Sequence, residues 1–589
     1  MQNNELTTKR VSLWLFDLAL ILGVCLLLFF RAIGDTPFYD KQEAREALVI
    51  WEIHQSGDWI LPLRNGREIP AKPPFYHWLG AVASTIAGTV DELTARLPSA
   101  VLGTLGVVLT YAAGVFLWGR CAGLVAALVL STSFEWRAAR QARVDMALTF
   151  VLLCSFLFFL YLYRTRGGRT KATLLGLLLG LAALAKGPLG IVLPTLTFLI
   201  FLWRKRDLAF FRELHPITVV VTCAVVAGSW YSLALWQGGR EFLFMVIKEN
   251  FGTVVGKDAG HPHPFWWYVP YLFQRMAPWS LFFPGLGLFL YQERHRLAEK
   301  ELLYFVVWAA TVLIFFSIFS QKRTVYILSA YPAIALLFGA WWQDLSNKDV
   351  SDRPFFIITR LAGYLVAGSF IILSAMLIFQ FTNHEPLGYF ASSLTEKDQA
   401  DLAHIADLLT KDRMAIFIWA GLCGLGGVLS LVAVKKNMWR GFMGCTAVLM
   451  VVSLVNVQNL DTELARQYSY KPFMRRVVAI VKDAPLFFYR SEDYTVLFYA
   501  GRHIHRFRAQ VTSVPFYILL WQKEWNSVQN KAALAVLATS ENTDKEDPKR
   551  GHLLLVRVEK PEAFVPESKQ RLTDSEKGIA GRLLVFKTS

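Results

Sequence analysis

Long apolar runs separated by short polar segments fill the chain up to about residue 460. The runs repeatedly approach the length that a helix needs to cross a bilayer, about 20 residues. The pattern therefore predicts a polytopic α-helical membrane protein with about thirteen spans. The predicted spans cover residues 13–30, 97–118, 121–134, 146–163, 174–185, 189–203, 217–236, 279–291, 302–319, 324–341, 356–381, 414–434 and 442–455. Residues 75–88 are apolar but short and interrupted, so we expect them to lie at the membrane surface.

The order of the spans predicts a topology. The first run follows Lys9 and Arg10 and lacks a convincing cleavage site, so we interpret it as an uncleaved span with its N-terminus inside. Counting from there places the basic segments 164–171, 204–206 and 435–440 in the cytoplasm, as the positive-inside rule requires. Residues 31–96 and 237–268 then form two long outer loops. We expect a bacterial inner-membrane protein whose functional site lies on the periplasmic face.

The composition changes from about residue 461 onward, where the chain resembles a soluble protein. Residues 486–489, 495–499, 552–558 and 583–586 have the composition of strands. Residues 471–482 and 532–538 are expected to be helical or part of a strand. The sequence therefore predicts a transmembrane domain at 1–460 and a small α/β periplasmic domain at 461–589.

Charge and cysteine usage narrow the class of protein. The net charge is +16, from 61 Lys and Arg against 45 Asp and Glu. Basic cytoplasmic loops explain this excess, and a share of it could neutralise a phosphate-bearing substrate, so we expect no nucleic-acid partner. Five of the six cysteines lie inside apolar runs and no Cys-x-x-Cys occurs. Neither disulfides nor a thiolate metal site is therefore expected.

The first outer loop carries the most informative residues. Asp40 and Glu43 are three residues apart, so a helix that begins there places both on one face, although Asp40 could equally cap that helix. A carboxylate at the membrane surface suits a general base for an acceptor hydroxyl. Lys72 precedes two prolines and suits a phosphate, although lysines also extend toward lipid headgroups for no other reason.

The order of these motifs resembles a known family. An acidic residue, Glu43-Ala44-Arg45, Ser56-Gly57-Asp58-Trp59, and Lys72-Pro73-Pro74 followed by Tyr76 and Trp78 resemble the lipid-dependent glycosyltransferases of the GT-C superfamily. Within it, the motifs are similar to the bacterial aminoarabinose lipid A transferases and their relatives among protein mannosyltransferases. The resemblance implies about thirteen spans, a long first outer loop and an outer C-terminal domain.

The resemblance also implies roles for residues of this loop. The essential carboxylate would be Asp40 or Glu43, because Gln42 stands where the aminoarabinose branch has an aspartate. Arg45 keeps the family spacing, and Lys72 would bind the substrate phosphate. Ala71 replaces the acidic residue that precedes this lysine in the aminoarabinose branch, so recognition of an aminosugar or a metal is not carried over.

Further candidates lie at the outer ends of later spans, where cations run against the insertion bias and so indicate a task. The resemblance matches Asp145 to a second outer carboxylate, and the segment from Gln321 to Tyr331 to a Lys-x-x-x-Tyr motif. The candidates for phosphate binding are Lys72, Arg45, Arg143, Lys186, Lys322 and Arg323, and those for substrate binding are Tyr76, Trp78, Tyr326 and Tyr331.

The second long outer loop contains His261 and His263, two residues apart between prolines. They are candidate ligands of a divalent metal ion, but the remaining ligands are not evident, so no cofactor is assigned. The aromatic residues that follow are typical of a membrane-interface belt.

These features favour a transferase that moves a monosaccharide from a polyprenyl (undecaprenyl) phosphate-linked donor to lipid A, another surface glycan or a protein, with inversion by single displacement. The sequence has no Gly-rich phosphate loop, so the sugar donor is not expected to be a nucleotide. Membrane lipids would be the other partners. The alternatives are a lipid or glycan flippase and a structural assembly subunit.

Overall fold

The structure is a computed structural model that describes residues 2–252, 263–297, 299, 301–347, 354–382, 399, 413–507, 515–528, 531, 534–543 and 547–559. The chain forms two compact units. The first contains Met1–Pro37 and Arg45–Leu464, and the second contains Phe38–Ala44 and Ala465–Ser589. Seven residues of the first outer loop are therefore grouped with the C-terminal domain.

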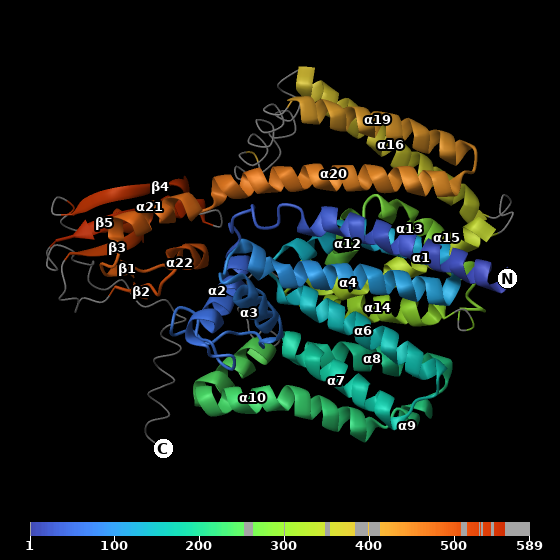
Figure 1. Cartoon of the computed structure of the whole chain (residues 1–589), viewed down its shortest axis with the longest axis horizontal. Coiled ribbons are helices and arrows are strands. Elements are labelled where there is room, and N and C mark those ends of the chain that lie inside the picture. The colour runs from blue at the N-terminus through green and yellow to red at the C-terminus, as the bar shows by residue number, and fades with distance from the viewer. Residues whose placement is uncertain are drawn as a thin grey trace. The chain divides into compact units, whose positions relative to one another are not determined.

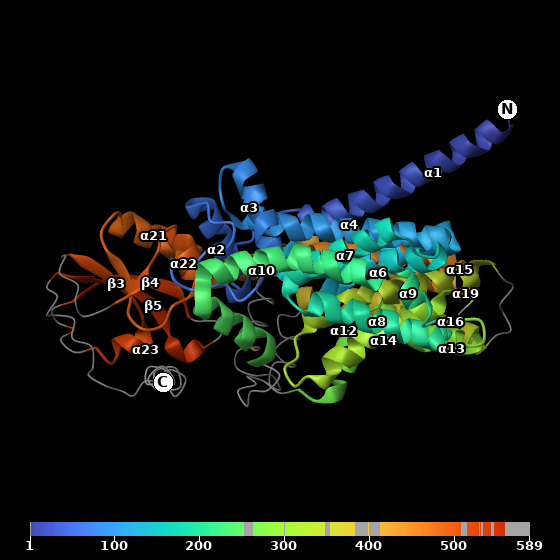
Figure 2. The ribbon, with the colours of Figure 1, turned by 90° about the horizontal axis from the view of Figure 1, so that it is seen from below.

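Helices build the first unit (Figures 1 and 2), and each predicted apolar run lies on one of them or on a helix together with an adjoining turn. The helices are α1 (Gln2–Cys25), α2 (Lys41–Ser56), α3 (Phe75–Ala87), α4 (Glu92–Trp118), α5 (Arg120–Thr132), α6 (Val144–Arg164), α7 (Arg169–Lys186), α8 (Leu189–Lys205), α9 (Phe210–Glu213), α10 (Pro216–Ile247), α12 (Tyr268–Arg275), α13 (Phe283–Gln292), α14 (Leu302–Ile318), α15 (Tyr331–Asn347), α16 (Pro354–Thr382), α19 (Arg413–Lys435) and α20 (Trp439–Tyr468). Tighter or wider turns connect or extend them: η1 (Leu26–Phe30), η2 (Phe134–Arg140), η3 (Lys248–Gly252), η4 (Phe265–Trp267), η5 (Trp279–Phe282) and η6 (Thr324–Ala330).

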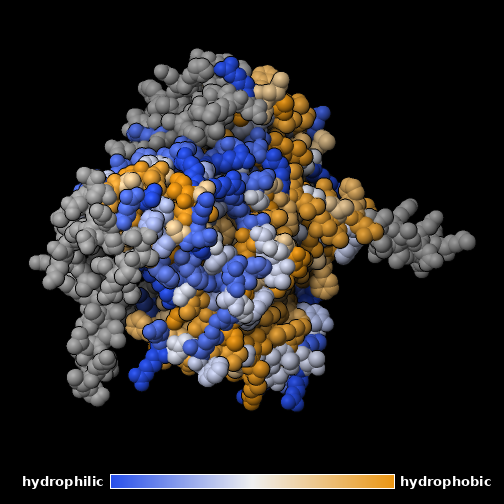
Figure 3. Space-filling view, turned by 60° about the vertical axis from the view of Figure 1, so that its left-hand side comes forward, coloured by the Kyte–Doolittle hydropathy of each residue, from blue (hydrophilic) through white to orange (hydrophobic). Residues whose placement is uncertain are grey.

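The outward faces of this bundle are apolar. Ile217 and Trp236 of α10 are 79% and 85% exposed. Figure 3 shows hydrophobic side chains covering broad areas of the surface next to hydrophilic ones. Eight helices within the described ranges are long and apolar enough to cross a membrane. Exposed apolar surface of this extent belongs in lipid, so the chain is a multi-pass membrane protein. The number of thirteen crossings stays a prediction.

Close packing holds the helices together in two ways. Helix α15 lies in the interior, where Tyr331, Trp341 and Trp342 are buried among neighbouring helices. Helices α7 and α10 approach each other at Gly176 and Gly180, where an added methyl group would collide with the backbone or side chains of α10. Two small residues four apart let helices in lipid pack backbone to backbone.

A five-stranded sheet organises the second unit. Its strands are β1 (Leu486–Phe488), β2 (His505–Arg506), β3 (Phe516–Trp521), β4 (Ala535–Thr543) and β5 (His552–Val558), in the order β2-β1-β3-β5-β4. Strand β1 runs parallel to β2 and β3, whereas β5 is antiparallel to β3 and β4. All six residues of β3 are buried. Helices α21 (Lys471–Val481), α22 (Tyr494–Ala500) and α23 (Gln522–Trp525) accompany the sheet.

The predicted elements of this unit were partly wrong. Residues 495–499 form helix α22 instead of a strand, because the Asp493 side chain accepts hydrogen bonds from the backbone N–H groups of Thr495 and Val496 and so caps a helix. Strand β3 was not predicted. The predicted strands at 486–489 and 552–558 are confirmed. Of the two segments expected to be helical or part of a strand, 471–481 forms helix α21 and 535–538 belongs to strand β4. The predicted strand at 583–586 lies outside the described residues.

Candidate functional site: a charge cluster in the helical unit

Two helix ends bring opposite charges together in the first unit. Asp145 lies in the first turn of α6, and Lys186 is the last residue of α7, which are the positions where the helix dipole favours an acid and a base. The Lys186 ammonium forms an ion pair with the Asp145 carboxylate, and both side chains are largely buried. The ammonium also lies 4.3 Å from the centre of the Tyr326 ring. These contacts fix the position of the Lys186 charge.

The turn that follows Lys186 depends on glycine. Gly187 has a φ of +73°, a conformation that residues with a side chain rarely adopt. A Cβ atom at this position would also approach the Asn250 side chain to 3.0 Å. The turn at the end of α7 therefore lies against segment η3, which carries Glu249 next to Asn250.

A second ion pair joins the first. Lys72, just before α3, pairs with Glu249 of η3. Lys72 and Arg143 also interact electrostatically with Asp145, and Arg323, Lys72 and Glu249 interact with Tyr326. We call Lys72, Arg143, Asp145, Lys186, Glu249, Arg323 and Tyr326 the charge cluster. Its four cations outnumber its two carboxylates, so the cluster is suited to an anion that carries one or two negative charges.

A neighbouring acid borders the charge cluster. Glu135 of η2 is buried and lies 3.7 Å from the Arg275 guanidinium of α12. Burial raises the pKa of Glu135 above its ordinary value, although Thr324, Arg275 and Arg143 oppose this shift. Tyr331 interacts electrostatically with Glu135 and Arg275, and its buried hydroxyl has no hydrogen-bond partner among the described residues. Tyr331 therefore belongs to the environment of Glu135 and Arg275 and not to the charge cluster.

Several residues of the first loop have structural contacts instead. The Arg45 guanidinium donates to the Glu46 carboxylate at 2.8 and 3.1 Å, and the other Glu46 oxygen lies 2.7 Å from Nε2 of His77. Burial would raise the pKa of Glu46, but Arg45 and His77 hold it well below its ordinary value. The fully buried Tyr76 hydroxyl donates to the Ala95 carbonyl at 2.7 Å. The geometry thus favours packing roles for Arg45 and Tyr76.

Trp78 has a similar structural environment. Its indole N–H donates to the Trp59 carbonyl at 2.7 Å. The side chain packs against an apolar group that includes Trp230 and Phe242 of α10. These contacts hold the outer loop against α10 and supply no polar group for a substrate.

The two candidate base residues belong to the second unit. The Asp40 carboxylate accepts the backbone N–H of Gln42 at 2.8 Å, so Asp40 caps α2. Glu43 is 3% exposed. Lys41, between them, lies 3.6 Å from Asp493 of the same unit. The structure thus gives Asp40 a capping role and leaves the choice between Asp40 and Glu43 as a prediction.

Lys322 and His263 connect two loops. The Lys322 ammonium donates to the backbone carbonyls of Phe319 and His263, and burial lowers its pKa. The imidazole of His263 stacks on Trp267 with ring centres 4.5 Å apart. Within the described ranges, no group of three or more His, Cys, Asp or Glu side chains is placed to hold a metal ion. His261 lies outside the described residues.

Sequence patterns do not single out Glu249, Glu135 or Arg275. Each is a single charged residue beside an apolar or aromatic segment, and such residues are common at membrane interfaces. The charge of Glu135 directly after a predicted span was the only available signal. Glu46 and His77 likewise lie in helical patterns that gave no reason to pair them.

Comparisons with known proteins find a matching family model and several relatives. Residues 71–231, which include Lys72, Arg143, Asp145 and Lys186, match the family model described as dolichyl-phosphate-mannose-protein mannosyltransferase. An uncharacterized protein of Aquifex aeolicus is 31% identical over 56% of this chain and 65% of its own length. An undecaprenyl phosphate-alpha-4-amino-4-deoxy-L-arabinose arabinosyl transferase of Yersinia enterocolitica is 28% identical over 55% of this chain and 58% of its own length. The chain thus spans less than two thirds of the length of these relatives.

A solved structure covers nearly the whole chain. ArnT from Cupriavidus metallidurans bound to undecaprenyl phosphate matches 93% of this chain and 99% of its own, with a TM-score of 0.73 and 20% identity. The expected fold, with a helical membrane part and a small C-terminal domain, is therefore confirmed. The resemblance to aminoarabinose transferases and protein mannosyltransferases is also confirmed, since the chain shares its fold with the former and a matched segment of sequence with both.

Proposed function

We propose that the protein transfers a monosaccharide from a polyprenyl phosphate-linked donor to an acceptor at the outer face of the inner membrane. One observation carries the proposal: four cations and two carboxylates meet at the ends of α6 and α7, in a unit whose outer surface is apolar. An anionic headgroup attached to a long apolar tail fits such a site. Relatives that are named for an undecaprenyl phosphate-linked donor support it.

The charges have a direct use in the reaction. As the bond between the anomeric carbon and the phosphate oxygen breaks, its electron pair passes to the phosphate, which changes from a singly to a doubly charged group. The excess positive charge around Lys186 and Lys72 stabilises this developing charge. The acceptor oxygen forms the new bond on the opposite face, so the configuration at the anomeric carbon inverts.

The acceptor determines what the outer-loop carboxylate does. A hydroxyl acceptor must lose its proton, and Asp40 or Glu43 would take it as a general base. A lipid A phosphate is already ionised, so for this acceptor the carboxylate would only position the group. The sugar, a pentose or a hexose, follows from the donor lipid and is not specified by the charge cluster.

The proposed orientation follows from charge. The basic segments 164–171, 204–206 and 435–440 are expected in the cytoplasm, which leaves the charge cluster on the periplasmic side.

Mass spectrometry of lipids from a strain that lacks the gene tests the proposal. We expect a polyprenyl phosphate-sugar to accumulate, and its mass to identify the sugar. Complementation with the wild-type gene should remove the accumulated lipid, whereas the Lys186→Met variant should not. If the donor lipid does not accumulate and a glycolipid is instead trapped on one side of the membrane, the protein is a flippase.

A further inference from the structure

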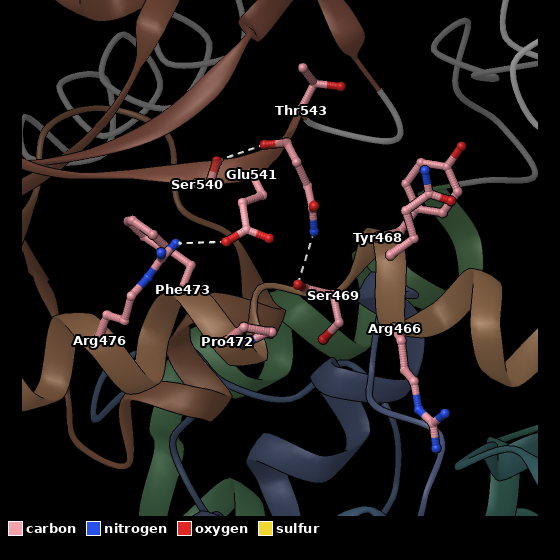
Figure 4. A pocket seen from close by; sticks show the side chains of 11 residues that line it. Arg466, Tyr468, Ser469, Pro472, Phe473, Arg476, Ser540, Glu541 and Thr543 are labelled. Atoms are coloured by element: carbon pink, nitrogen blue, oxygen red, sulfur yellow. Dashed lines mark hydrogen bonds and ion pairs between the residues drawn. The ribbon is translucent and has the colours of Figure 1, made fainter. Parts of the chain in front are cut away.

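A polar cavity lies within the second unit, and no residue of the charge cluster lines it. It has a volume of about 410 Å³ and is lined by the end of α20, the start of α21 and strand β4 (Figure 4). Its lining includes Arg466, Tyr468, Phe473, Arg476, Glu541 and Asn542. We call this cavity the bulge pocket, because an irregularity of β4 forms one of its walls.

Two extra residues in β4 create that wall. Thr539 pairs with Leu554 and Thr543 pairs with His552, so four steps along β4 oppose only two along β5. Ser540 holds the bulge in shape: its hydroxyl donates to the Asn542 carbonyl at 2.6 Å and accepts the Leu553 N–H at 2.8 Å. Bulges of this kind change the direction of side chains and are frequent beside binding sites.

The bulge directs two polar side chains toward the helices. Glu541 lies 3.3 Å from the Arg476 guanidinium, and the Asn542 amide donates to the Ser469 carbonyl at 2.9 Å (Figure 4). Arg476 also donates to the Thr539 carbonyl at 3.4 Å. The Arg476 and Glu541 side chains are 50% and 75% exposed, so their ion pair contributes little stability and can exchange for a ligand.

The lining has the chemistry of an anionic-sugar site. The Arg476 guanidinium faces the Glu541 carboxylate, whereas the Arg466 side chain points away from both (Figure 4). Arginine binds phosphate through paired hydrogen bonds, so Arg476 can exchange Glu541 for a phosphate. The carboxylate, an amide and hydroxyl groups can bind sugar hydroxyls. Tyr468, which is half-buried, adds aromatic surface against which the apolar face of a sugar ring can pack.

The helix that carries the pocket comes directly from the membrane. Helix α20 is continuous from Trp439 to Tyr468, and the span predicted on it ends at Val455. The thirteen residues that follow add about 20 Å of helix. The headgroup layer extends only about 6 Å beyond the hydrocarbon on each side of the bilayer. A sugar that projects from a lipid headgroup is therefore a more suitable ligand than the headgroup phosphate of an ordinary phospholipid.

We propose that the bulge pocket binds a phosphorylated saccharide, the exposed part of a glycolipid acceptor. The assignment to an acceptor rests on the proposed function, but the binding itself does not require a donor lipid. Loss of sugar binding to the pocket would contradict this proposal, whereas loss of transfer with binding intact would contradict the proposed function.

Binding of soluble sugars to the full chain in nanodiscs tests the proposal. We expect saturable binding of glucosamine 6-phosphate, and weaker binding of glucosamine and of inorganic phosphate. Arg476→Gln should weaken glucosamine 6-phosphate binding about tenfold, the effect of one charge-assisted hydrogen bond. Glu541→Gln should strengthen it, because the carboxylate that competes for Arg476 is removed.

The matched control is Arg506→Gln. Arg506 forms an exposed ion pair of 2.9 Å with Glu492 in the same unit and does not line the pocket. An equal loss of binding in Arg506→Gln and Arg476→Gln, at unchanged melting temperature, would overturn the proposal. Equal affinity for inorganic phosphate and glucosamine 6-phosphate would overturn the role of the sugar. Lipid A added to the nanodisc should compete with the probe, and a failure to compete would overturn the assignment to a membrane glycolipid.

Discussion

Replacing Lys186 with methionine tests the charge cluster as a phosphate site. The Lys186 side chain is 7% exposed, so its charge is poorly screened by solvent. A hydrogen bond from an ammonium group to an anion contributes about 1.5–3 kcal/mol, which corresponds to a 10- to 150-fold change in affinity. Because the group is buried, we expect the upper half of this range. The assay is binding of undecaprenyl phosphate to the purified protein.

A double substitution separates binding from folding. Lys186→Met leaves the Asp145 carboxylate without its cation in a site where the carboxylate is 14% exposed, which should destabilise the protein by about 3–5 kcal/mol. Adding Asp145→Asn removes that charge and should restore most of the melting temperature. It should not restore the affinity for undecaprenyl phosphate, since the ammonium is still absent.

The result that refutes this reasoning is simple to recognise. If Lys186→Met in the Asp145→Asn background binds undecaprenyl phosphate as tightly as the single Asp145→Asn variant, Lys186 does not contact the phosphate. The ion pair would then serve only to join α6 and α7.

Three further outcomes are expected. Asp40→Asn keeps the cap of α2, because asparagine caps as well as aspartate. The transfer activities of Asp40→Asn and Glu43→Gln should therefore differ sharply. Full activity in both variants would exclude a carboxylate base in this loop. Glu46→Gln should lower the free energy of unfolding by about 3 kcal/mol at neutral pH. Because the pKa of Glu46 is lower in the folded state, its stabilising contribution is present above the ordinary pKa of 4.5 and is lost as the pH falls below that value. Melting curves from pH 7 to 3 will measure this loss. Tyr326→Phe should keep the affinity for undecaprenyl phosphate, whereas Tyr326→Leu should lose several-fold as the ring facing Lys186 disappears.

The helices of the first unit were predictable because hydrophobicity alone determines them. A membrane span must be both apolar and long, so each predicted run lies on a helix or on a helix with an adjoining turn. The number of helices that cross the membrane was harder to predict, because α13 has only 10 residues and α5 only 13. Short helices of this kind are defined by packing against their neighbours, which a hydropathy pattern does not record.

All residues of the charge cluster except Glu249 were candidates from the sequence. They could be identified because a charge or a motif at the outer end of a span is unusual. Their pairing could not, since residues 72 and 249 are far apart in the chain and only the folded bundle joins them. Arg45 and Tyr76 matched the family motif, yet their polar groups are engaged by Glu46 and the Ala95 carbonyl.

The second unit shows a different limit of sequence patterns. Residues 495–499 are rich in residues that favour strands, but a single carboxylate at Asp493 captures two backbone N–H groups and starts a helix. A local hydrogen bond therefore overrides a preference spread over five residues. The bulge of β4 is equally local, because it depends on the Ser540 hydroxyl and its two backbone partners.

The two ion pairs of the charge cluster differ in burial, and this difference suggests separate roles. Lys186 and Asp145 are 7% and 14% exposed, whereas Lys72 and Glu249 are 22% and 33% exposed. A buried pair is costly to separate, so Lys186 remains fixed and provides a preorganised charge. A more exposed pair exchanges its partner at little cost, so Lys72 can leave Glu249 for an arriving phosphate. Under the proposed function, the rigid cation would set where negative charge develops, and the exchangeable cation would let the anion enter and leave.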